Sequence, residues 1–125
     1  MITTGTLIIS PIGAQLTHDT EYFGTMDPYC IIKVGQQSYK TKTSTDGGKS
    51  PSWIGHTFSF NKQAETMGEV QIWDDDLGGD DHIGGGSFSI SDIMGKPECI
   101  IDVQLTYKGK SAGICQLKCK FAQDQ

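Results

Sequence analysis

Short apolar runs separated by glycine dominate this chain of 125 residues, and they limit the folds that it can adopt. The chain contains 16 glycines, and no helical pattern of apolar residues lasts long enough for a long helix. Eight segments instead indicate strands, because their apolar and polar side chains alternate or because β-branched residues predominate. These segments span residues 6–12, 29–34, 37–43, 53–61, 69–73, 85–90, 101–107 and 115–121.

This spacing predicts an all-β fold, an eight-stranded antiparallel β-sandwich formed by residues 1–125 as a single domain. We expect one short helical turn at Ser91–Met94, with Ser91 as its N-cap and Gly95 as its end. The four cysteines show no CxxC spacing, so reduced thiols in the core are expected, with a disulfide or a zinc site as the alternative. They are Cys30, Cys99, Cys115 and Cys119.

Charge and composition narrow the classes of partner. The formal net charge is −5 at pH 7, and no basic stripe with interleaved aromatic residues is present to neutralise the phosphates of a nucleic acid. The chain shows no secretory signal, no apolar run long enough to span a membrane and no lipidation motif. We therefore expect a cytoplasmic protein, favoured as a monomer, whose contact with membranes is peripheral.

Two acidic segments carry most of the negative charge of the chain. If successive strands run antiparallel, the connections at residues 13–28, 44–52, 74–84 and 108–113 all lie at one end of the sandwich, so both acidic segments meet there. Crowded carboxylates repel one another unless a cation or a proton neutralises them, and many oxygen ligands without nearby thiols favour Ca²⁺. The acidic residues are Asp19, Glu21 and Asp27 in the first segment and Asp74, Asp75, Asp76, Asp80 and Asp81 in the second.

Three motifs, in order along the chain, resemble those of the C2 domain family. The resemblance covers essentially the whole chain and is greatest to the small single-domain members known from plants. It implies a Greek-key sandwich with the type II, circularly permuted topology. The motifs are Gly5-Thr6-Leu7 with residues 19–29, then Pro51-Ser52-Trp53 with Phe58-Ser59-Phe60, and then Trp73-Asp74-Asp75-Asp76 with Asp80-Asp81-His82-Ile83-Gly84.

The resemblance also implies a calcium cage of five carboxylates, which are those of Glu21, Asp27, Asp74, Asp76 and Asp81. The chain departs from the family pattern in three ways. Glutamate stands at position 21 where aspartate is usual, so Asp19 or a water is an alternative ligand at that corner. The loop formed by the third motif, residues 73–84, is about one residue shorter than in the family, which leaves the choice between Asp80 and Asp81 open. Ile54-Gly55 replaces an Asn-Glu pair that braces the loops.

The function that the resemblance implies is calcium-dependent binding to anionic phospholipid membranes. Five carboxylates with two bound calcium ions carry a net charge of −1, and with three ions a charge of +1, so binding the metal reverses repulsion from the membrane. Lipid phosphates then fill open coordination sites. We expect membrane insertion by Tyr22, Phe23 and Leu77, and headgroup contacts by Lys40, Lys42, Lys108 and Lys110.

Two other functions fit the chain less well. The Ile54-Gly55 pair and the lack of a basic cluster favour a calcium-independent domain of the same fold that binds other proteins. A metal-dependent hydrolase needs a base or a nucleophile beside the metal, and His82 is the only candidate, so an enzyme is not expected. The nearby carboxylates are expected to raise the proton affinity of His82.

Overall fold

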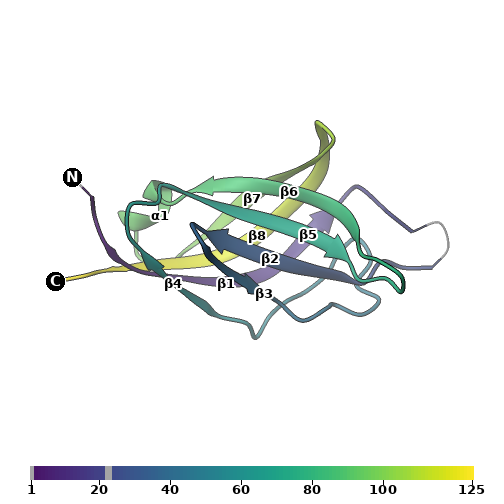
Figure 1. The fold of residues 1–125 in the computed structure, drawn as a ribbon, viewed down its shortest axis with the longest axis horizontal. Coiled ribbons are helices and arrows are strands. Elements are labelled where there is room, and N and C mark those ends of the chain that lie inside the picture. The colour runs from purple at the N-terminus through teal and green to yellow at the C-terminus, as the bar shows by residue number, and fades with distance from the viewer. Residues whose placement is uncertain (1, 22–23) are drawn as a thin grey trace.

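An elongated β-sandwich forms the body of the molecule, and the computed structural model describes residues 2–21 and 24–125 (Figure 1). The prediction of an all-β fold with eight antiparallel strands is confirmed, whereas the type II topology stays a prediction. The sheet order is β3-β2-β5-β6-β7-β8-β1-β4. The elements are β1 (Gly5–Leu16), β2 (Pro28–Val34), β3 (Gln37–Lys40), β4 (Phe58–Lys62), β5 (Met67–Asp74), β6 (Asp81–Ser89), α1 (Ser91–Met94), β7 (Cys99–Tyr107) and β8 (Lys110–Gln123).

Alternating side chains build the core between the two layers of strands. Along β1 every second residue from Gly5 to Pro11 is buried, as expected for a strand with one face on the core. The two edge strands are also bridged, because the side-chain amide of Gln37 in β3 pairs with the peptide of Asn61 in β4. Gln37 Nε2 donates to the Asn61 carbonyl at 2.7 Å, and the Asn61 N–H donates to Gln37 Oε1 at 2.8 Å. This bridge nearly closes the sandwich.

Several predicted strand boundaries differ from the structure, and two of the differences have a clear physical cause. β1 runs on to Leu16 rather than ending at Ile12, because its pairing with β8 resumes after a bulge between Pro11 and Gly13. Glycine is required at position 13, since a Cβ there would lie 2.5 Å from the Pro51 carbonyl oxygen. The predicted segment 53–61 forms a regular strand only from Phe58, because Trp53 instead donates hydrogen bonds to the carbonyls of Ile12 in β1 and Pro28 in β2.

The short helix is present, but the prediction of Ser91 as its N-cap is wrong. Ile90 occupies the N-cap position with helical dihedral angles, and no side chain caps the helix. The chain leaves β6 with the buried Ile90 already in the helical conformation, so Ser91 becomes the first helical residue. Its hydroxyl hydrogen bonds to that of Ser89 at 2.8 Å.

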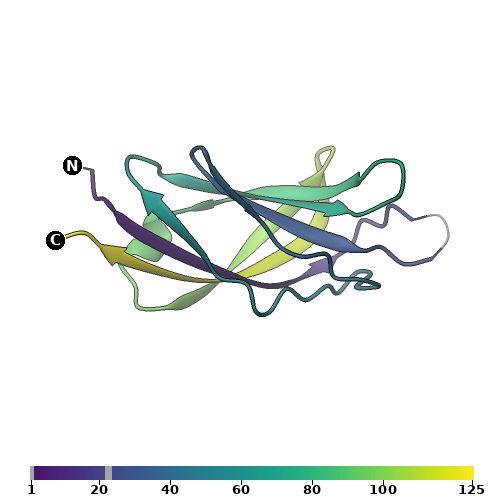
Figure 2. The same ribbon diagram turned by 60° about the horizontal axis from the view of Figure 1, so that its bottom comes forward.

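The two ends of the sandwich hold different elements. Both termini and α1 lie at one end, and the β1–β2 and β5–β6 connections lie at the other (Figures 1 and 2). The start of the β1–β2 connection also contacts the β7–β8 hairpin, since the Thr17 N–H donates to the Ala112 carbonyl at 3.0 Å. Among the described residues, no helix is long and apolar enough to cross a membrane.

Candidate metal centre

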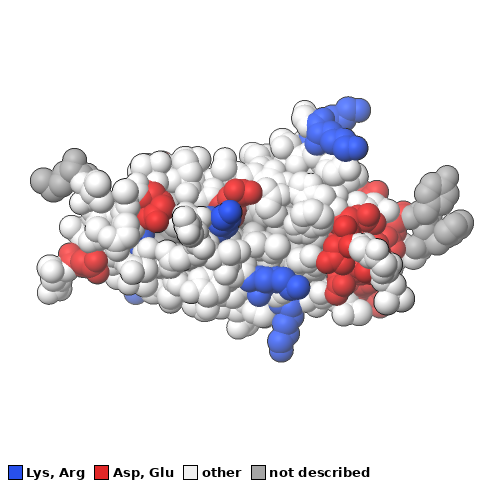
Figure 3. All heavy atoms as spheres, in the orientation of Figure 1, with Lys and Arg blue, Asp and Glu red and all other residues white. Residues whose placement is uncertain are grey.

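The two acidic segments meet at the end of the sandwich formed by residues 17–21, 24–27 and 74–81, which we call the acidic end. The Asp27 N–H donates to Asp74 Oδ1 at 2.8 Å, and the Asp75 N–H donates to the Asp27 carbonyl at 2.9 Å. The Thr20 hydroxyl donates to Asp74 Oδ2 at 2.7 Å. Figure 3 shows acidic side chains crowded at this end. Strand parity therefore placed the two segments correctly.

Four carboxylates form a compact cluster at the acidic end. One oxygen each of Glu21, Asp74, Asp76 and Asp81 lies within 4.8 Å of the others. Ligands about 2.3–2.6 Å from one calcium ion are separated by up to about 5 Å, so this spacing suits a shared hard cation. Asp74 is fully buried while Asp81 is exposed, so the cluster extends from the protein interior to solvent.

Register explains why the carboxylate of Asp81 rather than that of Asp80 lies in the cluster. Asp74 and Asp81 are directly paired at the end of the β5–β6 hairpin, so their side chains project from the same face. The carboxylate of Asp80 instead accepts hydrogen bonds from the Tyr29 hydroxyl at 2.5 Å and from the Asp76 N–H at 3.1 Å. The Tyr29 hydrogen bond lowers the pKa of Asp80, and burial followed by the Asp80 contact raises the pKa of Tyr29 to about 12.

Asp27 and Asp19 lie beside the cluster rather than within it. Oδ1 of Asp27 accepts the Asp46 N–H at 2.7 Å, in the connection between β3 and β4. Oδ1 of Asp19 accepts the Glu21 N–H at 2.9 Å and so orders the chain before Glu21. Of the seven predicted metal ligands, the structure thus brings four together and gives Asp19, Asp27 and Asp80 protein hydrogen bonds.

The crowding of the carboxylates shifts the pKa values of two members of the cluster. A hydrogen bond to Asp74, followed by desolvation and by contacts with Asp76, raises the pKa of Glu21 to about 7. Desolvation and the charges of Asp74 and Asp81 also raise the pKa of Asp76. In the absence of a cation the cluster therefore retains a proton near neutral pH, and a bound divalent ion would replace it.

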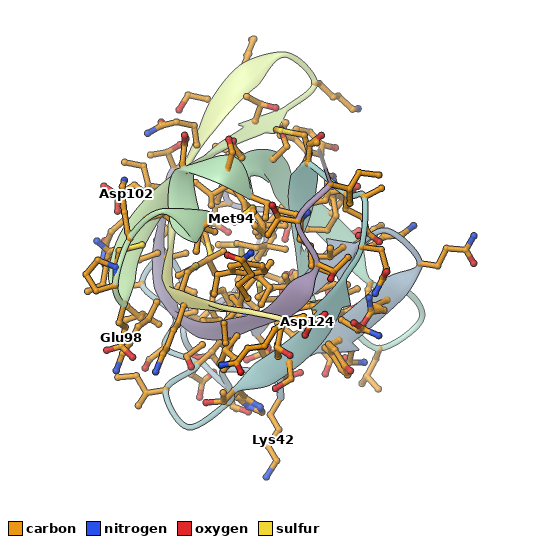
Figure 4. The ribbon with its side chains drawn as sticks, turned by 90° about the vertical axis from the view of Figure 1, so that its left-hand side faces the viewer. Lys42, Met94, Glu98, Asp102 and Asp124 are labelled. Atoms are coloured by element: carbon orange, nitrogen blue, oxygen red, sulfur yellow. The ribbon has the colours of Figure 1, made fainter. Side chains whose placement is uncertain are left out.

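Of the residues predicted to touch a membrane, the structure describes Leu77 and the four lysines. Leu77 is fully exposed at the tip of the β5–β6 connection, whereas Tyr22 and Phe23 lie outside the described residues. Lysines flank the acidic patch on two sides in Figure 3, and Lys42 extends beyond the outline of the molecule in Figure 4. Lys40 Nζ lies 4.5 Å from the centre of the Tyr29 ring, and Lys108 Nζ lies 5.3 Å from that of Tyr107. Lys110 is exposed at the start of β8.

The expectation for His82 is wrong. Desolvation, followed by the charge of His18, lowers the pKa of His82 instead of raising it. His82 Nε2 lies 2.5 Å from Gln71 Oε1, and its ring is 5.8 Å from that of Tyr107, on which His18 stacks at 4.0 Å. The side chain thus lies among neutral and aromatic groups on the flank of the hairpin, and burial outweighs the nearby carboxylates.

Sequence reasoning missed three residues that position the site. These are Thr20, which hydrogen bonds to Asp74, Tyr29, which holds Asp80, and Asp46, whose N–H holds Asp27. Each partner is at least 19 residues away in the chain, so local spacing gave no signal for the contact. Asp46 adopts a left-handed backbone conformation with φ of 55°, and Asp46-Gly47 is a turn signal that the sequence does contain.

Comparison with known proteins identifies the family. The model of the C2 domain family matches residues 5–105. Elicitor-responsive protein 3 of rice (Oryza sativa subsp. japonica) is 32% identical over 91 residues, which are 71% of this chain and 62% of that protein. The aligned region thus spans less than two thirds of this relative.

Solved structures show the same fold. A C2 domain-containing protein from a putative elicitor-responsive gene superposes with a TM-score of 0.83 at 22% identity, over 98% of this chain and 91% of that one. A C2 domain of plant Extended Synaptotagmin 1 superposes with a TM-score of 0.81 at 17% identity, over 97% and 96% of the two chains. With the family model matching most of its length, this chain belongs to the C2 domain family.

Proposed function

We propose that this protein binds anionic phospholipid membranes in a calcium-dependent manner through its acidic end. The observation that carries this proposal is the cluster of four carboxylates, contributed by two segments of the chain and held within 4.8 Å. C2 domains are generally binding modules rather than enzymes, and many of them bind phospholipid surfaces. A cytoplasmic protein that moves to membranes when calcium rises would fit these properties.

Glu21, Asp74, Asp76 and Asp81 are the proposed first ligands for calcium. Asp27 is the proposed fifth, because its backbone is already bonded to Asp74 and rotation of its side chain would release the Asp46 N–H. Calcium takes about six to eight oxygens, so two or three ions would share these carboxylates and leave coordination sites for other oxygen donors. Asp19 and Asp80 are proposed as supporting residues that hold the loops.

Charge reversal is the proposed trigger for membrane binding. Without calcium, the acidic end repels an anionic surface, and the bound ions remove that repulsion. Phosphate oxygens of lipids would fill the open coordination sites, so calcium and lipid would each strengthen the binding of the other.

Residues around the cluster would strengthen the attachment. Insertion of Leu77 contributes roughly 1.5–3 kcal/mol, and each lysine near the surface about 1 kcal/mol. The proposed lysines are Lys40, Lys42, Lys108 and Lys110, and Tyr22 and Phe23 are proposed to insert with Leu77.

Cosedimentation with vesicles tests the proposal. The protein is expected to pellet with phosphatidylserine-containing vesicles in calcium and to stay in the supernatant in chelator or with phosphatidylcholine vesicles. Asp76→Asn should abolish recruitment, whereas Asp102→Asn should not, because Asp102 is an exposed aspartate on the outer face of β7 that hydrogen bonds to Gln116. Lack of recruitment of the unmodified protein in calcium would reject the proposal.

A second candidate function is calcium-independent binding to another protein. Ile54 is 78% exposed and borders a groove of about 300 Å³ whose apolar lining includes Ile12 and Ile114. Calorimetry separates the two candidates, since a calcium titration without heat would favour this one.

A further inference from the structure

Two cysteines lie directly opposite each other on neighbouring strands, far from the acidic end. Cys99 begins β7 and is paired in register with Cys119 of β8. Directly opposed residues of an antiparallel pair project from the same face, with Cα atoms about 4.5–5.5 Å apart. A disulfide needs a Cα separation of about 4.4–6.8 Å. The strand pairing therefore places the two Cα atoms at a separation that a disulfide can span.

The two thiols differ in their access to solvent. Cys119 is 1% exposed, whereas Cys99 is partly exposed at the edge of the core. Glu98, the residue before Cys99, is exposed at the end of the molecule that faces the viewer in Figure 4 and forms an ion pair with Lys118 at 3.3 Å. Desolvation, followed by electrostatic interaction with Cys99 and Cys115, raises the pKa of Cys119 to about 12. Cys99 is therefore the thiol that a soluble oxidant meets first.

Distance disfavours one alternative pair of cysteines, and burial disfavours another. Cys115 and Cys119 are four residues apart on one strand, which separates their Cα atoms by about 13 Å and prevents a disulfide. Cys30 and Cys115 are both fully buried, and the contact between their thiols, together with desolvation, raises the pKa of Cys30. Strand register together with access to solvent thus favours the pair of Cys99 and Cys119.

We propose that Cys99 and Cys119 form an oxidation site that reacts with hydrogen peroxide to give an intramolecular disulfide. The Cys99 thiol releases its proton, the thiolate attacks one peroxide oxygen, and the O–O bond breaks to give Cys99 sulfenic acid and hydroxide. The hydroxide takes the released proton and forms one water. The sulfur of Cys119 then attacks the sulfenic sulfur, the S–O bond breaks, and the leaving hydroxide takes the Cys119 proton to form a second water. Each sulfur loses one electron, and the peroxide takes both.

Peptide mapping of the oxidised protein tests this proposal without calcium or lipid. The unmodified chain is treated with hydrogen peroxide, its remaining thiols are alkylated, and it is digested with trypsin. Cleavage after Lys110, Lys118 and Lys120 puts Cys115 and Cys119 on different peptides. We expect the mass to fall by two hydrogens per chain and Cys99 and Cys119 to resist alkylation. The peptides that carry these two cysteines should be joined by a cross-link that a reductant breaks.

Two variants complete the test. Cys99→Ser, a change at a partly exposed position, should abolish the cross-link, and Cys30→Ala should retain it once circular dichroism shows that the variant folds. A cross-link through Cys30 or Cys115, disulfide-linked dimers, or sulfinic acid at Cys99 without a cross-link would each overturn the proposal. Because the unmodified protein is mapped directly, the result does not depend on whether a variant folds.

Discussion

The acidic end and the opposite end of this sandwich both hold groups that are shifted away from their ordinary ionisation, but the causes differ. At the acidic end, a hydrogen bond with Asp74, followed by desolvation and by contacts with the other crowded carboxylates, raises the pKa of Glu21 to about 7. At the other end, burial inside a regular strand pair raises the pKa of Cys119 to about 12. Crowding of carboxylates is relieved by a shared cation, whereas the burial of a thiol is not. The first region is therefore suited to a metal and the second to neutral thiols.

Substitution of the buried Asp74 should have the largest effect, because it should change both vesicle binding and the free energy of unfolding. Asp74 is fully buried and accepts hydrogen bonds from Thr20 and Asp27. Asp74→Ala should abolish calcium-dependent binding to vesicles and also lower the free energy of unfolding by about 1–3 kcal/mol, because it leaves both donors unpaired. Asp76→Asn should abolish binding without that loss. Cosedimentation and denaturant unfolding check the pair, and equal destabilisation by the two variants would contradict this assignment.

Oxidation should affect the opposite end alone. A disulfide between Cys99 and Cys119 closes a loop of about twenty residues and should raise the free energy of unfolding by roughly 3 kcal/mol. The calcium affinity should stay the same, since the two cysteines lie far from the cluster. Urea unfolding and calcium calorimetry of the oxidised and reduced proteins measure both quantities. A change in calcium affinity on oxidation would show that the two ends are coupled.

Asp80 and Asp81, which are neighbours where the β5–β6 connection meets β6, offer a matched comparison within the acidic end. Asp81→Asn removes a carboxylate of the cluster and should weaken calcium binding about tenfold or more, which corresponds to about 1.4 kcal/mol. Asp80→Asn should weaken it much less, because its carboxylate is engaged by Tyr29 and Asp76. Calcium calorimetry of the two variants decides the point. The reverse order would mean that metal binding rearranges the loop.

Stability of the calcium-free protein should depend on pH near neutrality. The pKa of Glu21 is higher in the folded chain than its ordinary value of 4.5, so the folded state binds the proton more tightly than the unfolded state does. This contribution to stability is fully present below pH 4.5 and is lost as the pH rises through about 7. The melting temperature should therefore fall between pH 5 and pH 8, less so in Glu21→Gln. Saturating calcium should remove this dependence on pH. A melting temperature that does not change with pH in the absence of calcium would contradict the raised pKa of Glu21.

Much of the fold could be predicted because alternation along a strand is a local property. Alternating residues such as Val103, Leu105 and Cys115 face the core as expected. The errors occurred where a distant segment decides the local structure. Pairing with β8 extends β1 beyond Gly13. The buried Ile90 occupies the N-cap position that was predicted for Ser91.

The same limit applies to the candidate site. Strand parity brought the two acidic segments together, but the direction of each carboxylate depends on partners remote in the chain. Asp80 is held by Tyr29, 51 residues away, and Asp27 by Asp46, 19 residues away. The direct pairing of Asp74 with Asp81 follows from the hairpin register, which is shifted by an irregularity between Ile72 and Trp73. Neither the register nor these hydrogen bonds can be read from spacing alone.

Tyr29→Phe should have the smallest effect and gives the finest test of how the loop is held. The ring is buried beneath Lys40, so phenylalanine keeps the packing and removes only the hydrogen bond to Asp80. We expect the free energy of unfolding to fall by about 0.5–1.5 kcal/mol. Calcium affinity should change by less than about threefold, because Asp81 is positioned by strand pairing and not by Tyr29. A large gain in affinity would instead show that the Tyr29 hydroxyl withholds Asp80 from the metal, and Asp80→Asn in the same background should then cancel the gain.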